Sequence, residues 1–158
     1  MKIVIIGDGK VGHKLAVQLS EEDYDITLID QNQGRLKESI DELDVFCIAG
    51  KGTDAAIQKQ AGVSKADLVI ACASEDEKNM LSCLIAKKLG NCQTIARTKK
   101  PQYNKTIGLL KDDLGLALVI NSHISAAQEM ARALKFPNAI QLDTFAKGKQ
   151  YKPRPKLR

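Results

Sequence analysis

Short apolar runs alternate with stretches of helical periodicity along most of the chain. Six runs are short and mostly rich in β-branched residues, which is typical of strands. They predict strands at residues 2–6, 25–29, 45–49, 68–72, 93–96 and 117–120. The stretches between and after them predict helices at about residues 10–21, 32–41, 54–61, 76–89, 102–112 and 122–135.

The predicted strands are nearly continuous in apolar residues, as expected of strands covered by helices on both faces. Alternating β–α units of this kind predict an α/β fold: a doubly wound, Rossmann-type parallel sheet of about six strands, in the order 3-2-1-4-5-6. In helix 76–89, the three-to-four spacing of apolar side chains predicts one buried face. That face comprises Met80, Leu81, Leu84, Ile85 and Leu89.

A glycine-rich loop joins the first strand to the first helix. Gly7, Gly9 and Gly12 follow the G-x-G-x-x-G spacing. The first glycine permits a tight turn, the second allows the backbone to approach a pyrophosphate, and the third allows close packing of helix on strand. Free N–H groups and the positive dipole end of the helix would face the phosphates. Asp30 ends the second strand, where its carboxylate can accept hydrogen bonds from ribose hydroxyls. The sequence therefore predicts a nucleotide site.

Two further strand ends are expected to border this site, because ligands in open α/β sheets bind beyond the carboxyl ends of the strands. Residues 50–54 follow the third strand and residues 73–77 follow the fourth. Either loop is equally consistent with an ordinary helix cap, from Thr53-Asp54 in the first and from Ser74 or Asp76 in the second. Lys10, inside the glycine loop, either reaches a terminal phosphate or is a solvated lysine.

The net charge of +5 is concentrated at one end of the chain. Residues 147–158 hold six of the 24 basic residues and none of the 19 acidic ones, so the remainder is close to neutral. A near-neutral body is not typical of a nucleic-acid-binding domain. Residues 149–158 are predicted to form a flexible basic tail. An alternative makes this tail the functional part, through salt-sensitive attraction to anionic lipid or nucleic acid.

Other function classes find little support in the sequence. No window has the roughly 18 apolar residues of a membrane helix, and the first strand begins at residue 2, so we expect no leader. Cysteines 47, 72, 83 and 92 form no C-x-x-C pair and are predicted to be buried, reduced thiols of a cytosolic protein. No His, Cys, Asp or Glu cluster has metal-ligand spacing.

An NAD-dependent oxidoreductase, or its cofactor-binding half, is the main alternative to a binding module. Such an enzyme needs a proton donor or acceptor beside the nicotinamide. Neither histidine, His13 or His123, has an evident partner carboxylate, and both are predicted to be solvated, capping or structural. The 158 residues leave no room for a substrate domain. We therefore expect no enzymatic activity.

The chain resembles the nucleotide-binding N-terminal domain of the Trk/Ktr potassium-uptake regulatory subunits, also called the RCK or KTN domain. The resemblance covers about residues 1–148. The matching stretches are residues 2–12, 26–30, 50–54, 66–71, 74–80, 95–97 and 143–148.

The resemblance implies a role for eleven residues. Gly7, Asp8, Gly9, Lys10 and Val11 would cradle the phosphates, and Asp30 would hold the ribose. Gly52, Thr53, Ala73 and Ser74 would flank the nucleotide, and Arg97 would lie near the site or at a subunit contact.

The resemblance also implies a cytoplasmic regulatory subunit. Such proteins bind NAD(H) or adenine nucleotides (ATP or ADP) as regulators without transforming them. They form dimers and larger rings, and associate with a potassium-translocating membrane subunit at the inner face of the membrane. The acid at residue 30 would favour NAD(H) or adenosine nucleotides over NADP(H), because a 2′-phosphate would meet a carboxylate.

Overall fold

A computed structural model of the chain describes residues 1–113, 115, 116, 118–121 and 125. All of these except residue 125 belong to one compact unit, Met1–Ser122. Apart from residue 125, the predicted helix at 122–135 lies outside the described residues, as do the predicted domain boundary at 148 and the tail 149–158.

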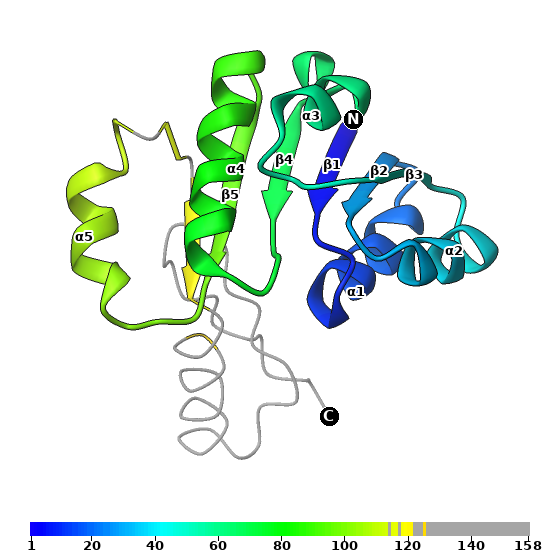
Figure 1. The fold of residues 1–158 in the computed structure, drawn as a ribbon, viewed down its shortest axis with the longest axis horizontal. Helices are drawn as coiled ribbons and strands as arrows, with labels where there is room; N and C mark the ends of the chain where they lie inside the picture. The colour runs from blue at the N-terminus through cyan, green and yellow to red at the C-terminus, as the bar shows by residue number, and fades with distance from the viewer. Residues whose placement is uncertain (114, 117, 122–124, 126–158) are drawn as a thin grey trace, which may run out of the picture. The chain divides into compact units, whose positions relative to one another are not determined.

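Six parallel strands form a single sheet in the order β3-β2-β1-β4-β5-β6, which confirms the predicted fold class and strand order (Figure 1). The central strand β1 pairs with β2 on one side and with β4 on the other, so that Ile3 lies between Ile26 and Leu68. The strands are β1 (Lys2–Ile6), β2 (Asp25–Asp30), β3 (Phe46–Ala49), β4 (Leu68–Ala71), β5 (Gln93–Thr98) and β6 (Leu118–Asn121).

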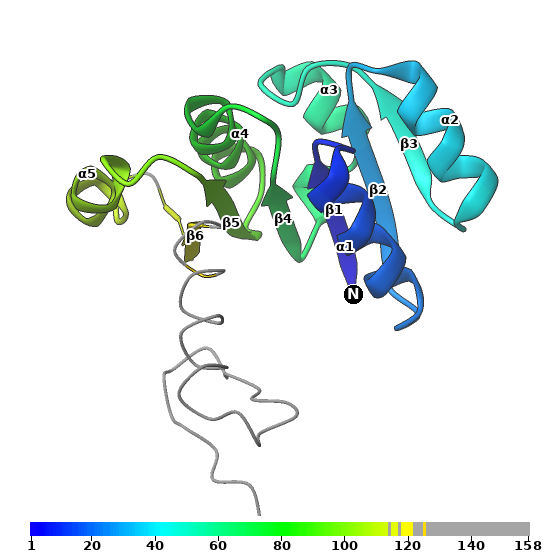
Figure 2. The ribbon, with the colours of Figure 1, turned by 90° about the horizontal axis from the view of Figure 1, so that it is seen from below.

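Helices cover both faces of the sheet (Figure 2). Side chains alternate between the faces: Ile3 and Ile5 of β1 pack in one apolar cluster, and Val4 and Ile6 pack in the other. The first cluster includes residues of α1 (Lys10–Ser20) and α2 (Gln33–Glu42). The second includes residues of α3 (Ala55–Gln60), the unpredicted 3-10 helix η1 (Val63–Lys65), α4 (Asp76–Leu89) and α5 (Tyr103–Leu110).

The fifth strand is two residues longer than predicted. Its parallel backbone pairing with β6 continues as far as Arg97, which pairs with Ile120, and Thr98, which pairs with Asn121. The extension falls on polar side chains, so hydrophobicity alone did not reveal it. As a result, Arg97 lies within the strand, near its carboxyl end.

The predicted buried face of α4 is only partly correct. Met80 and Leu89 pack against the apolar core, but Leu81 is 47% exposed, and the four other apolar residues of the predicted face are only partly buried. The fully buried residues of α4 are small or polar. These are Asp76, Asn79, Ser82, Cys83 and Ala86. Small side chains let the helix lie close to the sheet, and the polar ones bond to backbone groups of neighbouring loops.

Glu77 links the start of α4 to the start of α5. Its carboxylate accepts hydrogen bonds from the Lys100 ammonium at 2.8 Å and from the Tyr103 hydroxyl. These two donors lower the pKa of Glu77 to about 2. Because the folded pKa lies below the unfolded one, this contribution to stability is present above the unfolded pKa and is lost as the pH falls towards 2.

Glu77→Gln is therefore expected to lower the melting temperature at neutral pH, with a difference from the wild type that disappears as the pH falls towards 2. Thermal denaturation across this acid range measures the effect. Glu75→Gln removes a comparably exposed carboxylate that pairs with Lys78 within one turn of the chain. If Glu77→Gln lowered the melting temperature by the same amount at every pH, the stabilising role assigned to the Glu77 carboxylate would be contradicted.

Candidate functional site

A cavity of about 550 Å³ opens at the carboxyl ends of the strands, where the chain order reverses between β1 and β4. This is the switch point at which open α/β sheets bind ligands. Of the eleven predicted site residues, nine line the cavity: Gly7, Gly9, Lys10, Val11, Asp30, Gly52, Ala73, Ser74 and Arg97. Asp8 and Thr53 do not line it.

The glycine loop is as tight as its spacing predicts. Gly7 has a φ of +101°, and a Cβ there would lie 2.7 Å from the Ala73 nitrogen. A Cβ on Gly12 would lie 1.8 Å from the Gly7 carbonyl oxygen, so only glycine fits where α1 meets the loop. A Cβ on Gly9 would meet nothing within 4 Å. Gly9 thus leaves open space at the cavity wall.

Helix α1 begins at this wall without a side-chain cap. Its N-cap residue is Gly9, which has no side chain to bond the first amides. The first N–H groups of a helix have no partner within the helix. Together with the positive end of the helix dipole, they make the start of α1 suited to an anion.

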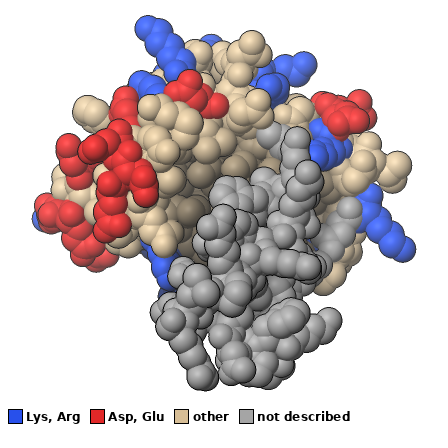
Figure 3. Space-filling model, turned by 180° about the vertical axis from the view of Figure 1, so that it is seen from behind, with Lys and Arg blue, Asp and Glu red and all other residues tan. Residues whose placement is uncertain are grey.

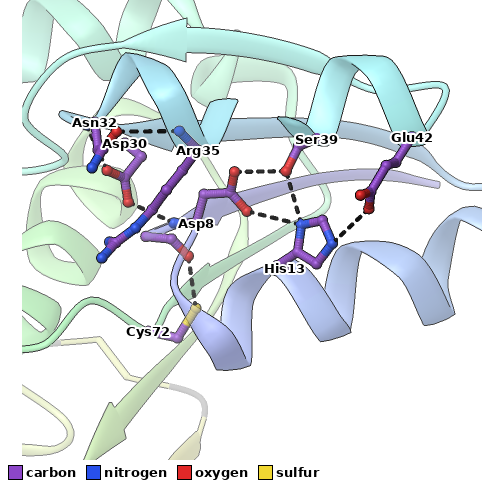
Figure 4. A network of polar contacts seen from close by, with 9 residues as sticks. Asp8, His13, Asp30, Asn32, Arg35, Ser39, Glu42 and Cys72 are labelled. Atoms are coloured by element: carbon purple, nitrogen blue, oxygen red, sulfur yellow. Dashed lines mark hydrogen bonds and ion pairs between the residues drawn. The ribbon is translucent and has the colours of Figure 1, made fainter. Parts of the chain in front are cut away.

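Asp30 fastens the glycine loop to the end of β2. One carboxylate oxygen accepts a hydrogen bond from the Asp8 backbone N–H at 2.7 Å, and the other accepts one from the Asn32 N–H at 2.7 Å (Figure 4). The Gly7 N–H donates to the Ile29 carbonyl in the same region. A carboxylate has about four lone-pair sites, so the half-buried Asp30 keeps acceptor capacity towards the cavity.

The side chain of Asp8 points away from the cavity into a polar network with α1 and α2 (Figure 4). Its Oδ2 accepts a hydrogen bond from the Ser39 hydroxyl at 2.7 Å. His13 places Nδ1 2.9 Å from Ser39 Oγ and 3.5 Å from Asp8 Oδ1, and Nε2 3.2 Å from Glu42 Oε2. The expectation that His13 lacks a partner carboxylate is therefore wrong. Asp8 lies in the glycine loop just before α1, whereas Ser39 and Glu42 come from α2, and local spacing does not reveal these two.

The opposite wall is held by two polar side chains of α4. The Asn79 amide nitrogen donates to the carbonyls of Ala73 (3.0 Å) and Arg97 (2.9 Å), while its oxygen accepts from the Ala73 N–H at 2.8 Å. Oδ2 of the buried Asp76 accepts from the backbone N–H groups of Lys99 and Lys100, each at 2.9 Å. These bonds tie the β4–α4 loop and the end of β5 to the first turns of α4.

The predicted helix caps have mixed outcomes. Asp54 caps α3 by accepting from the Ala56 N–H at 2.8 Å, as one of the two interpretations of that loop predicted. In the next loop, neither Ser74 nor Asp76 caps α4. Its N-cap residue is Glu75, which makes no side-chain cap bond. The carboxylate of Asp76 instead accepts from the backbone of Lys99 and Lys100, just after β5.

The cavity wall is rich in positive charge. Lys10, Arg35, Arg97 and Lys99 line it, with Asp30 as the one acid among the described lining residues. Arg97 Nε is buried and has no hydrogen-bond partner within the described part of the chain. By contrast, exposed acids gather on the side of the molecule that carries α1 and α2 (Figure 3). This charge distribution favours an anionic ligand in the cavity.

Gly50 lines the cavity as part of the loop 50–54 that was expected to border the site. Five further lining residues besides Ile6 and Ile29 were not predicted: Gln31, Asn32, Arg35, Cys72 and Lys99. Three of them lie at or just after the ends of predicted strands, where the rule that placed Asp30 could have found them. Arg35, within α2, and Lys99, beyond the unpredicted end of β5, carry no such signal.

The cysteines are free thiols. Three are buried as predicted, whereas Cys47 is half-buried. Burial raises the pKa of Cys72, which lines the cavity, to about 12, so this thiol is not a nucleophile at neutral pH. Among the described residues, no group of three or more His, Cys, Asp or Glu side chains is placed to hold a metal ion. Within the same residues, no helix is long and apolar enough to cross a membrane.

The chain is similar to several known proteins. It is 38% identical over 149 residues to the Trk system potassium uptake protein TrkA homolog of Archaeoglobus fulgidus, covering 94% of this chain and 34% of that protein. It spans about a third of the length of the curated relatives that it matches.

Solved structures share the fold at lower sequence identity. The TrkA-N domain of the inner membrane protein ybaL from Escherichia coli superposes with a TM-score of 0.75 at 19% identity, over 84% of this chain and 96% of that one. The GsuK channel bound to NAD gives a TM-score of 0.64 at 23% identity, over 75% of this chain and 21% of that one. An ADP-bound GsuK structure gives the same TM-score at 22% identity, over 76% and 31%.

The TrkA-N domain family matches residues 3–136, which is most of the chain. The fold, the glycine loop and the similarity to the archaeal relative agree with this match. The chain belongs to the TrkA-N domain family.

Proposed function

We propose that this chain is the nucleotide-sensing part of a regulatory subunit of a potassium transporter or channel. It binds NAD(H) or an adenine nucleotide, ATP or ADP, without transforming it. The main observation in support is the cation-lined cavity at the sheet switch point, which combines an uncapped helix start with the carboxylate of Asp30. Pyrophosphate and ribose are the two groups that such an arrangement suits.

The regulatory assignment draws on the relatives. The similar archaeal protein is named as a potassium uptake protein, and structures of a channel with the same fold are described as bound to NAD and to ADP. By this proposal, the chain acts at the cytoplasmic face of a membrane through a potassium-translocating partner subunit, in a homodimer or larger ring. The nucleotide would act through its different affinities for two states of that assembly.

In the bound state, we assign the phosphates to the loop Gly7–Val11. In this loop Asp8 contributes its backbone, while its side chain points away from the cavity towards Ser39 and His13. The ribose lies at Asp30, and the far side of the nucleotide faces Ala73, Ser74 and Arg97. Gly52 borders the same space, and Thr53 contributes by shaping the loop behind it. Within the described residues, no observation favours the oxidoreductase, since the His13 ring is engaged by Asp8, Ser39 and Glu42 and does not line the cavity. The other candidate histidine, His123, lies outside those residues.

Nucleotide binding is tested by thermal denaturation of the full chain with NADH, NAD, ATP, ADP and NADPH. A ligand at 100 times its Kd should stabilise the protein by about 2.7 kcal/mol, which raises the melting temperature by roughly 5–10 °C for a protein of this size. NADPH is informative because Asp30 disfavours a 2′-phosphate, whereas Arg35 at the same cavity could accept one.

Asp30→Ala is expected to remove most of this ligand-induced shift. Asp54→Ala is the matched control, because it also removes a carboxylate that accepts from a backbone amide in the loop after a strand, but Asp54 caps α3 and does not line the cavity. Absence of a shift with all five nucleotides, for a folded wild-type chain, would overturn the proposed function.

A further inference from the structure

We propose that His13 is a positioning residue that links proton binding to nucleotide binding, with the protonated ring favouring the bound nucleotide. It acts beneath the glycine loop, through Asp8, and not in the cavity. This inference rests on the proposed function, because the linkage requires a nucleotide above the loop.

The contacts around His13 suit a protonated ring better than a neutral one. The single hydroxyl hydrogen of Ser39 goes to Asp8 Oδ2 at 2.7 Å, because an ionised carboxylate can only accept. Ser39 Oγ therefore faces Nδ1, at 2.9 Å, as an acceptor, so Nδ1 must carry a hydrogen. Nε2 faces a Glu42 carboxylate oxygen at 3.2 Å, and this contact is favourable only when Nε2 carries a hydrogen too. A neutral imidazole has only one N–H and cannot satisfy both sides.

The network reaches the nucleotide loop through one residue. The side chain of Asp8 is buried, and within the described part of the chain its Oδ1 has no hydrogen-bond donor, while His13 Nδ1 lies 3.5 Å away. The backbone N–H of the same residue donates to Asp30. A buried carboxylate without a positive partner is costly. Loss of the His13 proton therefore weakens the interaction of the ring with the Asp8 carboxylate. This interaction helps to fix the position of Asp8, and thus of the glycine loop between Gly7 and Gly9.

Other titratable groups near His13 come from the glycine loop, α1, α2 and β3. Among the described residues, only Asp8 and Glu42 place a carboxylate within 4 Å of the ring. On the β3 side, burial and the nearby Asp8 raise the pKa of Cys47 to about 11, so its thiol is neutral. The remaining charged side chains of α1 and α2 are exposed: Lys10, Lys14, Arg35, Lys37, Glu38 and Asp41. The ring therefore responds mainly to its two carboxylate partners.

The sign of the linkage follows from the charge of the ligand. A nucleotide brings negative charge to the loop directly above Asp8. The imidazolium offsets the Asp8 carboxylate and adds positive charge on the first turns of α1, so it favours an anion there. Linkage is reciprocal: if protonation of His13 tightens nucleotide binding, nucleotide binding must draw protons onto the protein.

Calorimetric titration with NAD tests the linkage on the full chain. NAD is a suitable probe because its pyrophosphate diester neither gains nor loses a proton in the range used. Histidine is the side chain that ordinarily changes charge between about pH 5 and 8, and coupling energies commonly correspond to 5–150-fold. We expect the wild-type Kd to rise roughly tenfold from about pH 5.5 to about pH 8.5. Repeating the titration in buffers of different ionisation enthalpy should reveal proton uptake on binding.

His13→Gln is expected to bind NAD with a nearly flat pH profile and no proton uptake. Glu42→Gln, at a side chain that is 62% exposed, removes one partner without disturbing the core and should reduce the pH dependence. Lys14→Gln, which removes an exposed charge at the next position of α1, should keep the wild-type profile. A purely structural role of His13 would weaken binding equally at every pH.

Two results would overturn the proposal and are distinguishable. If NAD binds with the same pH profile in the wild type and in His13→Gln, the proposed linkage is wrong and the proposed function stands. If no nucleotide binds at any pH, both fail.

Discussion

Gly12→Ala is expected to lower the free energy of unfolding by about 3 kcal/mol, the upper end of the usual cost of overpacking. The new Cβ would lie 1.8 Å from the Gly7 carbonyl oxygen, a backbone atom that cannot rotate away. Moving α1 outwards would disturb Gly7 as well, which is itself pressed against Ala73. Chemical denaturation monitored by circular dichroism measures the loss.

Gly9→Ala is the matched control in the same loop. Its Cβ would meet no atom within 4 Å, and the backbone at this position is extended, with a φ of −86°. Stability should stay within about 0.5 kcal/mol of wild type, as for ordinary surface substitutions. Nucleotide affinity should nevertheless fall, since the added methyl group projects into the space proposed for the phosphates. Equal losses of stability in the two variants would contradict this account of the loop.

Asn79→Ala is expected to cost roughly 2–4 kcal/mol of unfolding free energy, because each unsatisfied buried polar group costs about 1–3 kcal/mol. Three backbone groups lose their partner: the N–H and carbonyl of Ala73 and the carbonyl of Arg97. Asn79 is 1% exposed, so water does not readily replace the amide. The same denaturation experiment measures the effect.

Two further variants separate hydrogen bonding from volume at this position. Asn79→Asp keeps the shape but removes both donors, so it should be destabilised nearly as much as the alanine variant. Lys78→Ala, at a side chain that is 50% exposed on the preceding position, should have little effect. A stable Asn79→Asp variant would mean that volume, and not the bonding to Ala73 and Arg97, is what matters.

Much of the fold could be predicted because it depends on patterns local to the chain. Apolar, β-branched runs indicated all six strands, and their alternation with helices limited the arrangement to a doubly wound parallel sheet. The glycine spacing and the acid at the end of β2 indicated the place of the cavity for a similar reason. In such a sheet, residues that end neighbouring strands meet at one edge, so their positions along the sequence are enough to bring them together.

Local patterns failed where a polar side chain is used by a different element. The apolar spacing in α4 misled because Asp76 and Asn79 face the sheet to bond β5 and the β4–α4 loop, while Leu81 remains 47% exposed. Hydrophobic periodicity assigns a polar residue to the surface and has no means of recognising a buried polar group whose partners lie about 20 residues away.

The sequence by itself determined the strand order, the glycine loop and the acid at the end of β2, because period, spacing and strand ends are properties of consecutive residues. Only the tertiary structure decided that Asp8 turns away from the cavity, that His13 lies between two carboxylates, and that Arg35 and Lys99 join the wall. These outcomes depend on distances of a few ångströms between side chains of different elements. Such distances are set by the packing of α1 against α2 and of α4 against β5, and no spacing along the chain encodes them.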